Sequence, residues 1–368
     1  MVMRILYDKE IPKLDDFFLQ HGIESIPYAH REFSRSLLQE FAPQALFIRS
    51  TTKITPQLLS GTNIEFIATA TSGTDHIDPS ILNSSSLTCV SAKGSNANAV
   101  AEYCIAGILE FAYQKKQDLS SVTLGIIGYG NVGQRLALYA SLLGLNIIVH
   151  DPPRRNENLP FYHTYIDFSS LLDSADIISF HVPLEKAGNN STFHYLNKST
   201  IQLLRSNQLL INAARGGIID EQALLHSQKR PTLIFDTWEN EPQIFLQLAR
   251  QCFIATPHAA GYTSNAKENA SDAIIQSWMN FIGRQVNVTE AKYYDITHKK
   301  QPLSAQKSTI DICKNHNALR ESLANSRKLL LRSELFVQSH YHTDYSEVQT
   351  FDNHRSSFRQ DYEILSHD

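Results

Sequence analysis

Leu124-Gly-Ile-Ile-Gly-Tyr-Gly-Asn-Val-Gly133 is the stretch of sequence that decides the fold. The apolar run 122–127 predicts a buried strand, and Gly128, Gly130 and Gly133 follow it with G-x-G-x-x-G spacing at the start of a helix reaching Leu143. The first glycine permits a tight turn, the second lets the backbone approach a pyrophosphate, and the third lets helix and strand pack closely. The phosphates would lie at the helix N-terminus, where the dipole favours negative charge. The stretch therefore predicts a dinucleotide-binding Rossmann fold.

Asp151 supports this interpretation and indicates which dinucleotide binds. It ends the next apolar run, 146–150, about 20 residues past the glycines. A carboxylate at this place accepts hydrogen bonds from the adenosine ribose of NAD and would repel the 2′-phosphate of NADP. We therefore predict NAD as the cofactor. Arg154 and Arg155 follow closely enough that NADP stays open as the alternative.

Short apolar runs alternate with helical stretches along most of the chain, which is typical of parallel sheets with crossover helices. Before the glycine-rich turn we expect strands at 4–7, 45–48 and 66–68. After it, further strands are expected at 146–150, 177–180, 209–212, 233–236 and 253–255. Helices over 97–113 and 265–282 would carry the chain into a second domain and back.

These elements predict two doubly wound parallel-sheet α/β domains, because 368 residues correspond to two or three domains. Residues 97–256 are expected to form the NAD-binding Rossmann domain. Residues 1–96 and 257–284 are expected to form a discontinuous, flavodoxin-like substrate domain. The remaining segment, 285–368, is polar and rich in Lys, Ser, His and Asn, and we expect a small α+β domain there.

Composition excludes several classes of function. A net charge of −4 gives no electrostatic footprint for nucleic acid or an anionic membrane. No apolar run approaches the ~18 residues that span a bilayer, and the N-terminus lacks a signal-peptide pattern, so a cytoplasmic protein is expected. The four cysteines have no paired spacing, which argues against a zinc site or a disulfide framework. Asp75, His76 and Asp78 are expected to begin a helix rather than to bind a metal.

Three motifs that follow predicted strands carry the candidate chemistry. Arg215 lies in Ile211-Asn-Ala-Ala-Arg-Gly-Gly217, and its planar guanidinium matches a carboxylate in a bidentate fashion. Asp236 could receive the nicotinamide carboxamide, and either Glu239 or Glu241 could orient a base. His258 follows the last predicted strand. Because ligands of open α/β sheets bind at the carboxyl ends of the strands, these groups together predict an active site.

The motifs resemble those of the D-isomer-specific 2-hydroxyacid dehydrogenases. The family pattern is matched by Gly128–Gly133, Asn212–Gly216, Asp236–Pro242 and Pro257-His258. Other segments resemble a branch of the family that oxidises a phosphorylated 2-hydroxy acid in pyridoxal phosphate synthesis; they include 47–53, 68–78, 151–153, 180–184 and 258–263. The segment Phe351-Asp-Asn-His-Arg355 resembles a motif of the family's C-terminal dimerisation domain, so the resemblance implies a homodimer.

The resemblance also implies roles for individual residues. Arg215 would hold the substrate carboxylate, His258 would take the hydroxyl proton, and Glu241 rather than Glu239 would orient the imidazole. The substrate, a small phosphorylated 2-hydroxy acid, would contact Ser50, Thr71 and Tyr262. The NAD contacts implied by the family are Gly128, Gly130, Asn131, Val132, Gly133, Asp151, Val182, Ala213, Asp236 and Gly261, with Val182 where the family usually has threonine.

Two alternatives stay open. One is a dehydrogenase for another 2-hydroxy acid, of the phosphoglycerate or glyoxylate type. Arg49 and Lys53 flank Ser50 and favour a phosphorylated substrate. The other is a non-catalytic regulator that senses NAD, because a fold alone does not imply catalysis. Arg215, Glu241 and His258 are all present, which favours an enzyme.

Overall fold

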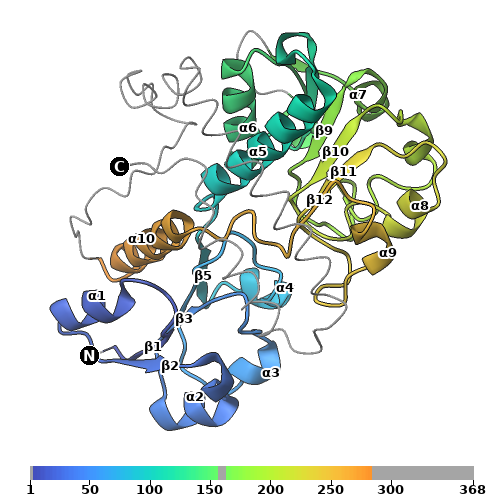
Figure 1. Cartoon of the computed structure of the whole chain (residues 1–368). Coiled ribbons are helices and arrows are strands. Elements are labelled where there is room, and N and C mark those ends of the chain that lie inside the picture. The colour runs from blue at the N-terminus through green and yellow to red at the C-terminus, as the bar shows by residue number, and fades with distance from the viewer. Residues whose placement is uncertain (1–2, 156–162, 284–368) are drawn as a thin grey trace. The chain divides into compact units, whose positions relative to one another are not determined.

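A computed structural model of the chain describes residues 3–155 and 163–283, which divide into two compact units. Unit 1 comprises residues 3–96 and 264–283, and unit 2 comprises the described residues between 97 and 263 (Figure 1). The dimerisation domain expected at 285–368, with its Phe351–Arg355 motif, lies outside the described residues.

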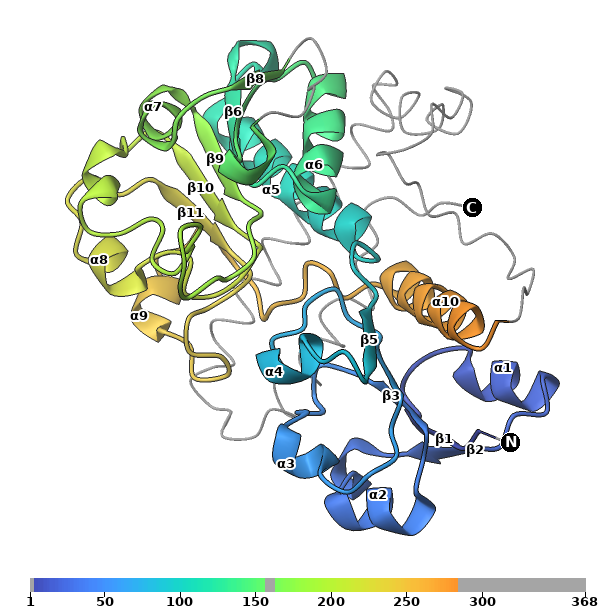
Figure 2. The same cartoon turned by 180° about the vertical axis from the view of Figure 1, so that it is seen from behind.

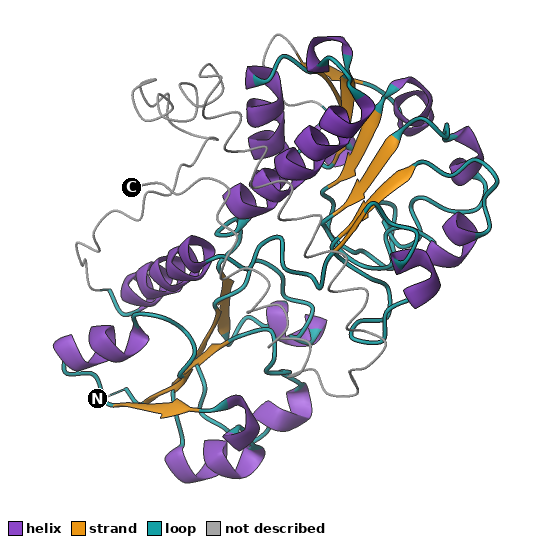
Figure 3. Cartoon of the chain, viewed as in Figure 1, coloured by secondary structure: helices purple, strands orange, loops and turns teal. Residues whose placement is uncertain are grey.

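Unit 1 is a five-stranded parallel sheet in the order β2-β1-β3-β4-β5 with helices around it (Figure 3). The strands are β1 (Ile5–Asp8), β2 (Ser25–Tyr28), β3 (Ala45–Ile48), β4 (Phe66–Thr69) and β5 (Thr88–Ser91). The helices are α1 (Leu14–Gln20), η1 (His30–Glu32), α2 (Arg35–Phe41), α3 (Pro56–Leu59), α4 (Pro79–Leu82) and α10 (Ser264–Phe281).

Both faces of this sheet are buried, as its continuous apolar strands require. On one face Phe47 and Phe66 pack against Trp278 of α10, with ring centroids 5.9 and 5.2 Å from the indole. On the other face Leu46 and Ile67 pack in a cluster with Leu38 of α2. Trp278 is 1% exposed, so the returning helix completes the core of unit 1.

Unit 2 is a seven-stranded parallel sheet in the order β12-β11-β10-β9-β6-β7-β8, with β8 at one edge (Figure 2). Its strands are β6 (Thr123–Ile127), β7 (Asn146–His150), β8 (His163–Tyr165), β9 (Ile177–Phe180), β10 (Leu209–Asn212), β11 (Thr232–Phe235) and β12 (Ile254–Ala255). Its helices are α5 (Ala97–Lys115), η2 (Leu119–Ser121), α6 (Asn131–Leu142), η3 (Pro152–Arg154), α7 (Phe168–Ser174), η4 (Thr200–Leu203), α8 (Glu221–Leu225) and α9 (Leu246–Ala249). The strand order reverses between β6 and β9, which is where doubly wound sheets bind ligands.

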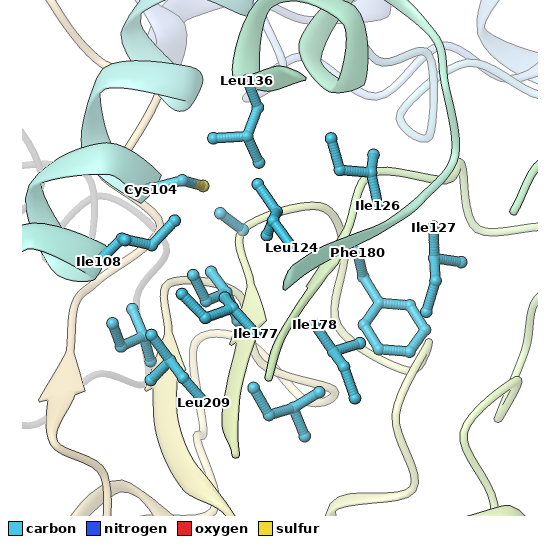
Figure 4. Close-up of a cluster of buried hydrophobic side chains, with 14 of the residues drawn as sticks. Cys104, Ile108, Leu124, Ile126, Ile127, Leu136, Ile177, Ile178, Phe180 and Leu209 are labelled. Carbon is cyan, nitrogen blue, oxygen red and sulfur yellow. The ribbon is translucent and has the colours of Figure 1, made fainter. Parts of the chain in front are cut away.

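The core of unit 2 lies between the central strands and the helices. Cys104 and Ile108 of α5 and Leu136 of α6 point toward Leu124 on one face of β6 (Figure 4). On the opposite face, the Cα of Gly125 lies so close to α7 that an added Cβ would be 2.6 Å from Leu171. The packing fixes the position of β6 and of the glycine-rich turn that follows it.

The expected two parallel-sheet domains are confirmed, and each predicted strand is present within about one residue of its bounds. Three strands escaped the prediction: β2, β5 and β8. Each ends its sheet, has one neighbour and lacks a fully buried apolar run. Unit 2 also extends to Thr263, beyond the boundary expected at residue 256, and the role of unit 1 in binding substrate stays a prediction.

Within the described residues, no helix combines the length and apolar character needed to cross a membrane.

Candidate active site

The candidate residues of unit 2 follow the carboxyl ends of its parallel strands. The glycine-rich turn follows β6, Asp151 follows β7 and Val182 follows β9. Ala213 and Arg215 follow β10, Asp236 and Glu241 follow β11, and His258 and Gly261 follow β12. Since all these strands are parallel, the sheet brings these residues to one edge.

The glycine-rich turn fits a dinucleotide pyrophosphate. Gly128 has φ +92°, which side chains rarely permit, and a Cβ on Gly133 would lie 2.1 Å from the Gly128 carbonyl oxygen. A Cβ on Gly130 would instead meet no atom within 4 Å, so the backbone there borders open space. Gly130 precedes α6, which begins at Asn131, and the helix N-terminus can therefore receive a phosphate at this point.

Asp151 is held in place by the backbone around it. Its Oδ2 accepts a hydrogen bond from Tyr129 N at 2.7 Å, and its Oδ1 caps η3 by accepting from Arg154 N at 3.3 Å. A carboxylate has about four acceptor positions, so these two bonds leave capacity for ribose hydroxyls. The Arg154 guanidinium donates to the carbonyl oxygen of Tyr129.

His181 and Val182 lie next to the glycine-rich turn, where a Cβ on Gly128 would collide with both residues. Burial lowers the pKa of His181 to about 3, and its Nε2 is 2.8 Å from Ser179 Oγ. The imidazole is therefore neutral near pH 7 and is a weak proton acceptor.

Arg215 lies in a loop whose shape is fixed by its neighbours. Asn212 Nδ2 donates to the Arg215 carbonyl oxygen at 3.0 Å, and Arg215 Nη1 donates to Ala214 O at 2.7 Å. A Cβ on Gly216 would lie 1.8 Å from the Trp238 carbonyl oxygen, so only glycine permits this approach. The loop after β10 thus packs directly against the turn after β11.

Asp236 organises the segment that carries His258. It is 1% exposed, and its carboxylate accepts from Thr256 Oγ1 at 2.5 Å, Ala259 N at 2.7 Å and Ala260 N at 3.0 Å. These bonds hold residues 256–260 against the end of β11 in unit 2. They occupy three of about four acceptor positions and leave one for a carboxamide donor.

His258 and Glu241 form a hydrogen-bonded pair. The imidazole Nδ1 is 2.8 Å from Glu241 Oε2, and both side chains are about one quarter exposed, at 29% and 23%. Because a carboxylate only accepts hydrogen bonds, Nδ1 carries the proton and Nε2 presents its lone pair when the ring is neutral. Glu239 instead contacts His194, with 3.0 Å between Oε1 and Nε2. The geometry separates two acids that spacing alone left as alternatives.

The backbone of His258 is in the left-handed region, with φ 53°. This conformation costs a non-glycine residue about 1–3 kcal/mol and persists only where the surroundings enforce it. His258 N donates to Asp236 O at 2.7 Å, and the next two amides bind the Asp236 carboxylate. Such enforced strain is concentrated at functional sites.

The candidate substrate residues Ser50 and Thr71 belong to unit 1, whereas Tyr262 belongs to unit 2. Ser50 follows β3 and is exposed. Thr71 follows β4; its Oγ1 donates to Gly73 O at 2.9 Å and lies 2.8 Å from Thr69 Oγ1. Ser50 and Thr71 thus share the carboxyl edge of the unit 1 sheet.

Three other polar side chains of unit 1 that the sequence analysis named, those of Arg49, His76 and Asp78, have structural partners. Arg49 Nε binds the buried Asp8 carboxylate at 2.9 Å, so part of the cation expected to favour phosphate is used within the fold. Asp78 caps α4, as expected, by accepting from Ser80 N at 2.9 Å. His76 Nε2 lies 2.9 Å from Thr69 Oγ1.

Two further residues near the pair escaped the sequence prediction. Glu221, the first residue of α8, accepts a hydrogen bond from Glu239 N at 2.8 Å, and His194 contacts the Glu239 side chain. Glu221 follows the helix-capping Asp220 and has the pattern of an ordinary first-turn acid. No sequence signal relates either residue to a turn that lies 18 or 45 positions further along the chain.

Comparison with known proteins gives relatives for this arrangement. Residues 98–260 match the D-isomer specific 2-hydroxyacid dehydrogenase, NAD binding domain. The erythronate-4-phosphate dehydrogenase of Proteus mirabilis is 38% identical over 292 residues, covering 78% of this chain and 76% of that protein. The enzyme of the same name from Hydrogenovibrio crunogenus is 38% identical over 279 residues, covering 74% of this chain and 72% of that protein.

Solved structures share the fold at lower identity. D-lactate dehydrogenase from Aquifex aeolicus, complexed with NAD and lactic acid, is 24% identical with a TM-score of 0.64, over 76% of this chain and 95% of that one. NAD-dependent formate dehydrogenase from Staphylococcus aureus, in complex with NAD, is 21% identical with a TM-score of 0.62, and the match covers 76% of this chain and 96% of that one. With its NAD-binding domain and its relatives of high coverage, the chain belongs to the D-isomer-specific 2-hydroxyacid dehydrogenases, and its cofactor is NAD.

Proposed function

We propose that the protein oxidises 4-phospho-D-erythronate at C2 with NAD and yields 2-oxo-3-hydroxy-4-phosphobutanoate, a step toward pyridoxal phosphate. The observation that carries the proposal is the 2.8 Å contact between Glu241 Oε2 and His258 Nδ1 at the edge of the NAD-binding sheet. The names of the relatives, at 38% identity, support the choice of substrate.

His258 is proposed to be the proton acceptor. With Nδ1–H donating to Glu241, the lone pair of Nε2 takes the proton of the C2 hydroxyl as the C2–O bond becomes a carbonyl. The hydrogen on C2 leaves with its bonding electron pair. NAD, when bound, supplies the nicotinamide C4 that accepts this hydride. A positioned base of this kind contributes about 10²- to 10⁴-fold to the rate.

Arg215 is proposed to bind the substrate carboxylate and to polarise the C2 oxygen. A guanidinium pairs with a carboxylate through two parallel N–H donors, which fixes orientation as well as charge. The contact between Gly216 and the Trp238 turn supports this role, because it keeps the Arg215 loop against the segment that carries Glu241.

The proposed NAD site follows the strand ends of unit 2. The amides of Asn131, Val132 and Gly133 at the start of α6 would face the pyrophosphate, and Asp151 would accept the ribose hydroxyls. The remaining acceptor position of Asp236 would take the carboxamide. Val182, Ala213 and Gly261 are the other proposed contacts; Val182 lacks the usual threonine hydroxyl but retains its backbone groups.

Ser50, Thr71 and Tyr262 are proposed to contact the substrate, with unit 1 as the substrate domain. A panel of phosphorylated and unphosphorylated 2-hydroxy acids, each assayed with NAD and with NADP, tests the function. The proposal predicts the highest kcat/KM with 4-phospho-D-erythronate and NAD. A higher kcat/KM with 3-phospho-D-glycerate or glycolate would show that the proposed substrate is wrong. NAD binding without turnover of any acid would indicate a regulator.

We further propose that the protein acts in the cytoplasm as a homodimer. Most soluble oligomers have closed two-fold symmetry, and the 351–355 motif resembles a dimerisation segment. Light scattering on the full chain tests this: a mass near twice 41.6 kDa is expected, and a monomer would overturn the proposal.

A further inference from the structure

The turn after β11 determines where Glu241 lies. Trp238 N donates to Glu241 Oε1 at 2.8 Å, while Trp238 Nε1 donates to Thr256 O at 2.9 Å. One carboxylate oxygen of Glu241 is therefore held by the turn, and the other is 2.8 Å from His258. A displacement of residues 238–239 would move Glu241 and with it the orientation of the imidazole.

Glu221 holds this turn at the backbone amide of Glu239. It is 3% exposed, and its Oε1 accepts from Glu239 N at 2.8 Å. Asp220 already caps α8 by accepting from Ala223 N at 2.8 Å, so the helix does not need the Glu221 carboxyl as a cap. Without Glu221, the half-buried amide of Glu239 would lose its acceptor, and the turn would lose this hydrogen bond.

His194 holds the same residue, Glu239, at its side-chain carboxylate. Its Nε2 lies 3.0 Å from Glu239 Oε1, and its Nδ1 lies 3.9 Å from Asp220 Oδ2. The backbone of His194 has φ 47° and donates to Gly217 O at 2.7 Å, which joins it to the loop after Arg215. The ring also stacks on Phe193, at 4.0 Å between centroids.

We propose that Glu221 and His194 are positioning residues for the dehydrogenase reaction: by holding Glu239 at its amide and at its carboxylate, they fix the turn that delivers Glu241 to His258. This inference rests on the proposed function of the Glu241–His258 pair. Neither residue touches the reacting atoms. Displacement of a catalytic group by about 1 Å can reduce the rate by 10²-fold, so holding Glu239 in place has a measurable consequence.

The chemical state of Glu221 is compatible with this role. Burial, and then the charges of Glu239 and Glu241, raise the pKa of Glu221 to about 7. In its neutral form the carboxyl keeps an acceptor oxygen for Glu239 N without adding a third negative charge. Glutamine presents the same acceptor, which provides a conservative variant.

Glu221→Ala and Glu221→Gln in the full chain, saturated with NAD, test the proposal, with Gln222→Ala on the same helix as an exposed control. Glu221→Ala is expected to lower kcat by about tenfold or more with NAD affinity within about twofold, and Glu221→Gln to stay within about threefold of the parent. Parent-like kcat in Glu221→Ala, or equal losses in Ala and Gln, would overturn the proposal.

A second measurement separates positioning from folding and from the proposed reaction. The ¹⁵N imidazole signals of His258, assigned with His258→Gln, report whether Nδ1–H still donates to Glu241. The signals should change in Glu221→Ala and in His194→Ala but not in Glu221→Gln. If Glu221→Ala does not fold, His194→Ala provides the test. Unchanged His258 signals and an unchanged kcat in His194→Ala would refute the proposed positioning role. A parent inactive on 4-phospho-D-erythronate would refute the proposed function, whereas the His258 signals would still test positioning.

Discussion

Glu221→Gln is expected to change how the stability of the protein depends on pH. Glu221 is buried in α8, and the titratable groups that interact with it are Glu239, Glu241 and the half-buried Cys252 thiol. Glutamine keeps the acceptor for Glu239 N and removes the charge. The variant therefore isolates the free energy of ionising one buried carboxyl.

The magnitude follows from the pKa. Raising the pKa of Glu221 from its ordinary 4.5 to about 7 corresponds to about 3 kcal/mol of folding free energy. Since the pKa is higher in the folded state, folded chains bind more protons than unfolded chains between these two values. The stabilisation is fully present below pH ~4.5 and is lost as pH rises through ~7. Between pH 5 and pH 8 this single group should lower parental stability by about 2 to 3 kcal/mol.

Urea unfolding of parent and Glu221→Gln at pH 5 and pH 8 measures the effect. Because the two proteins are compared at each pH, the contributions of other titrating groups to the free energy of unfolding cancel wherever the substitution does not affect them. The variant should gain about 2 to 3 kcal/mol relative to the parent between the two pH values. A difference that stays constant within about 0.5 kcal/mol would show that Glu221 titrates normally, and the account of its burial would be wrong.

Three further predictions concern the proposed site and the fold. His258→Ala should lower kcat by about 10²-fold or more while NAD affinity changes little, and activity within a few fold of the parent would remove His258 from the mechanism. Asp151→Ser should narrow the preference for NAD over NADP, because the carboxylate no longer repels a 2′-phosphate; an unchanged ratio of KM values would refute the ribose assignment. Trp278→Ala should destabilise the protein by about 3 to 5 kcal/mol in denaturant unfolding, since the indole is buried against Phe47 and Phe66, and a loss below about 1 kcal/mol would contradict that packing.

The parts of the fold that are predictable from sequence are those specified by residues close to one another in the chain. The run 122–127 and the glycines after it specify a strand and a turn because their constraints involve neighbours in the chain. The edge strands β2, β5 and β8 have no comparable pattern, since none of them is a fully buried apolar run. Their pairing is decided by the neighbouring strand.

For the candidate site, the sequence predicts which residues follow the ends of strands. Arg215, Asp236 and His258 each follow a strand, and parallel strands bring their ends to one edge. The choice between Glu239 and Glu241 required the turn after β11, in which one acid faces His258 and the other faces His194. The contact of Glu221 with that turn depends on how α8 packs, which no local spacing specifies.

The most direct test of the central claim is the formation of NADH when the full chain is mixed with NAD and 4-phospho-D-erythronate, with the product identified by mass spectrometry. The account predicts one NADH for each molecule of 2-oxo-3-hydroxy-4-phosphobutanoate formed, and a rate of NADH formation in His258→Ala that is about 1% of the parental rate or less. A parent that forms no NADH from this acid, or a His258→Ala variant that forms it at the parental rate, would contradict the account.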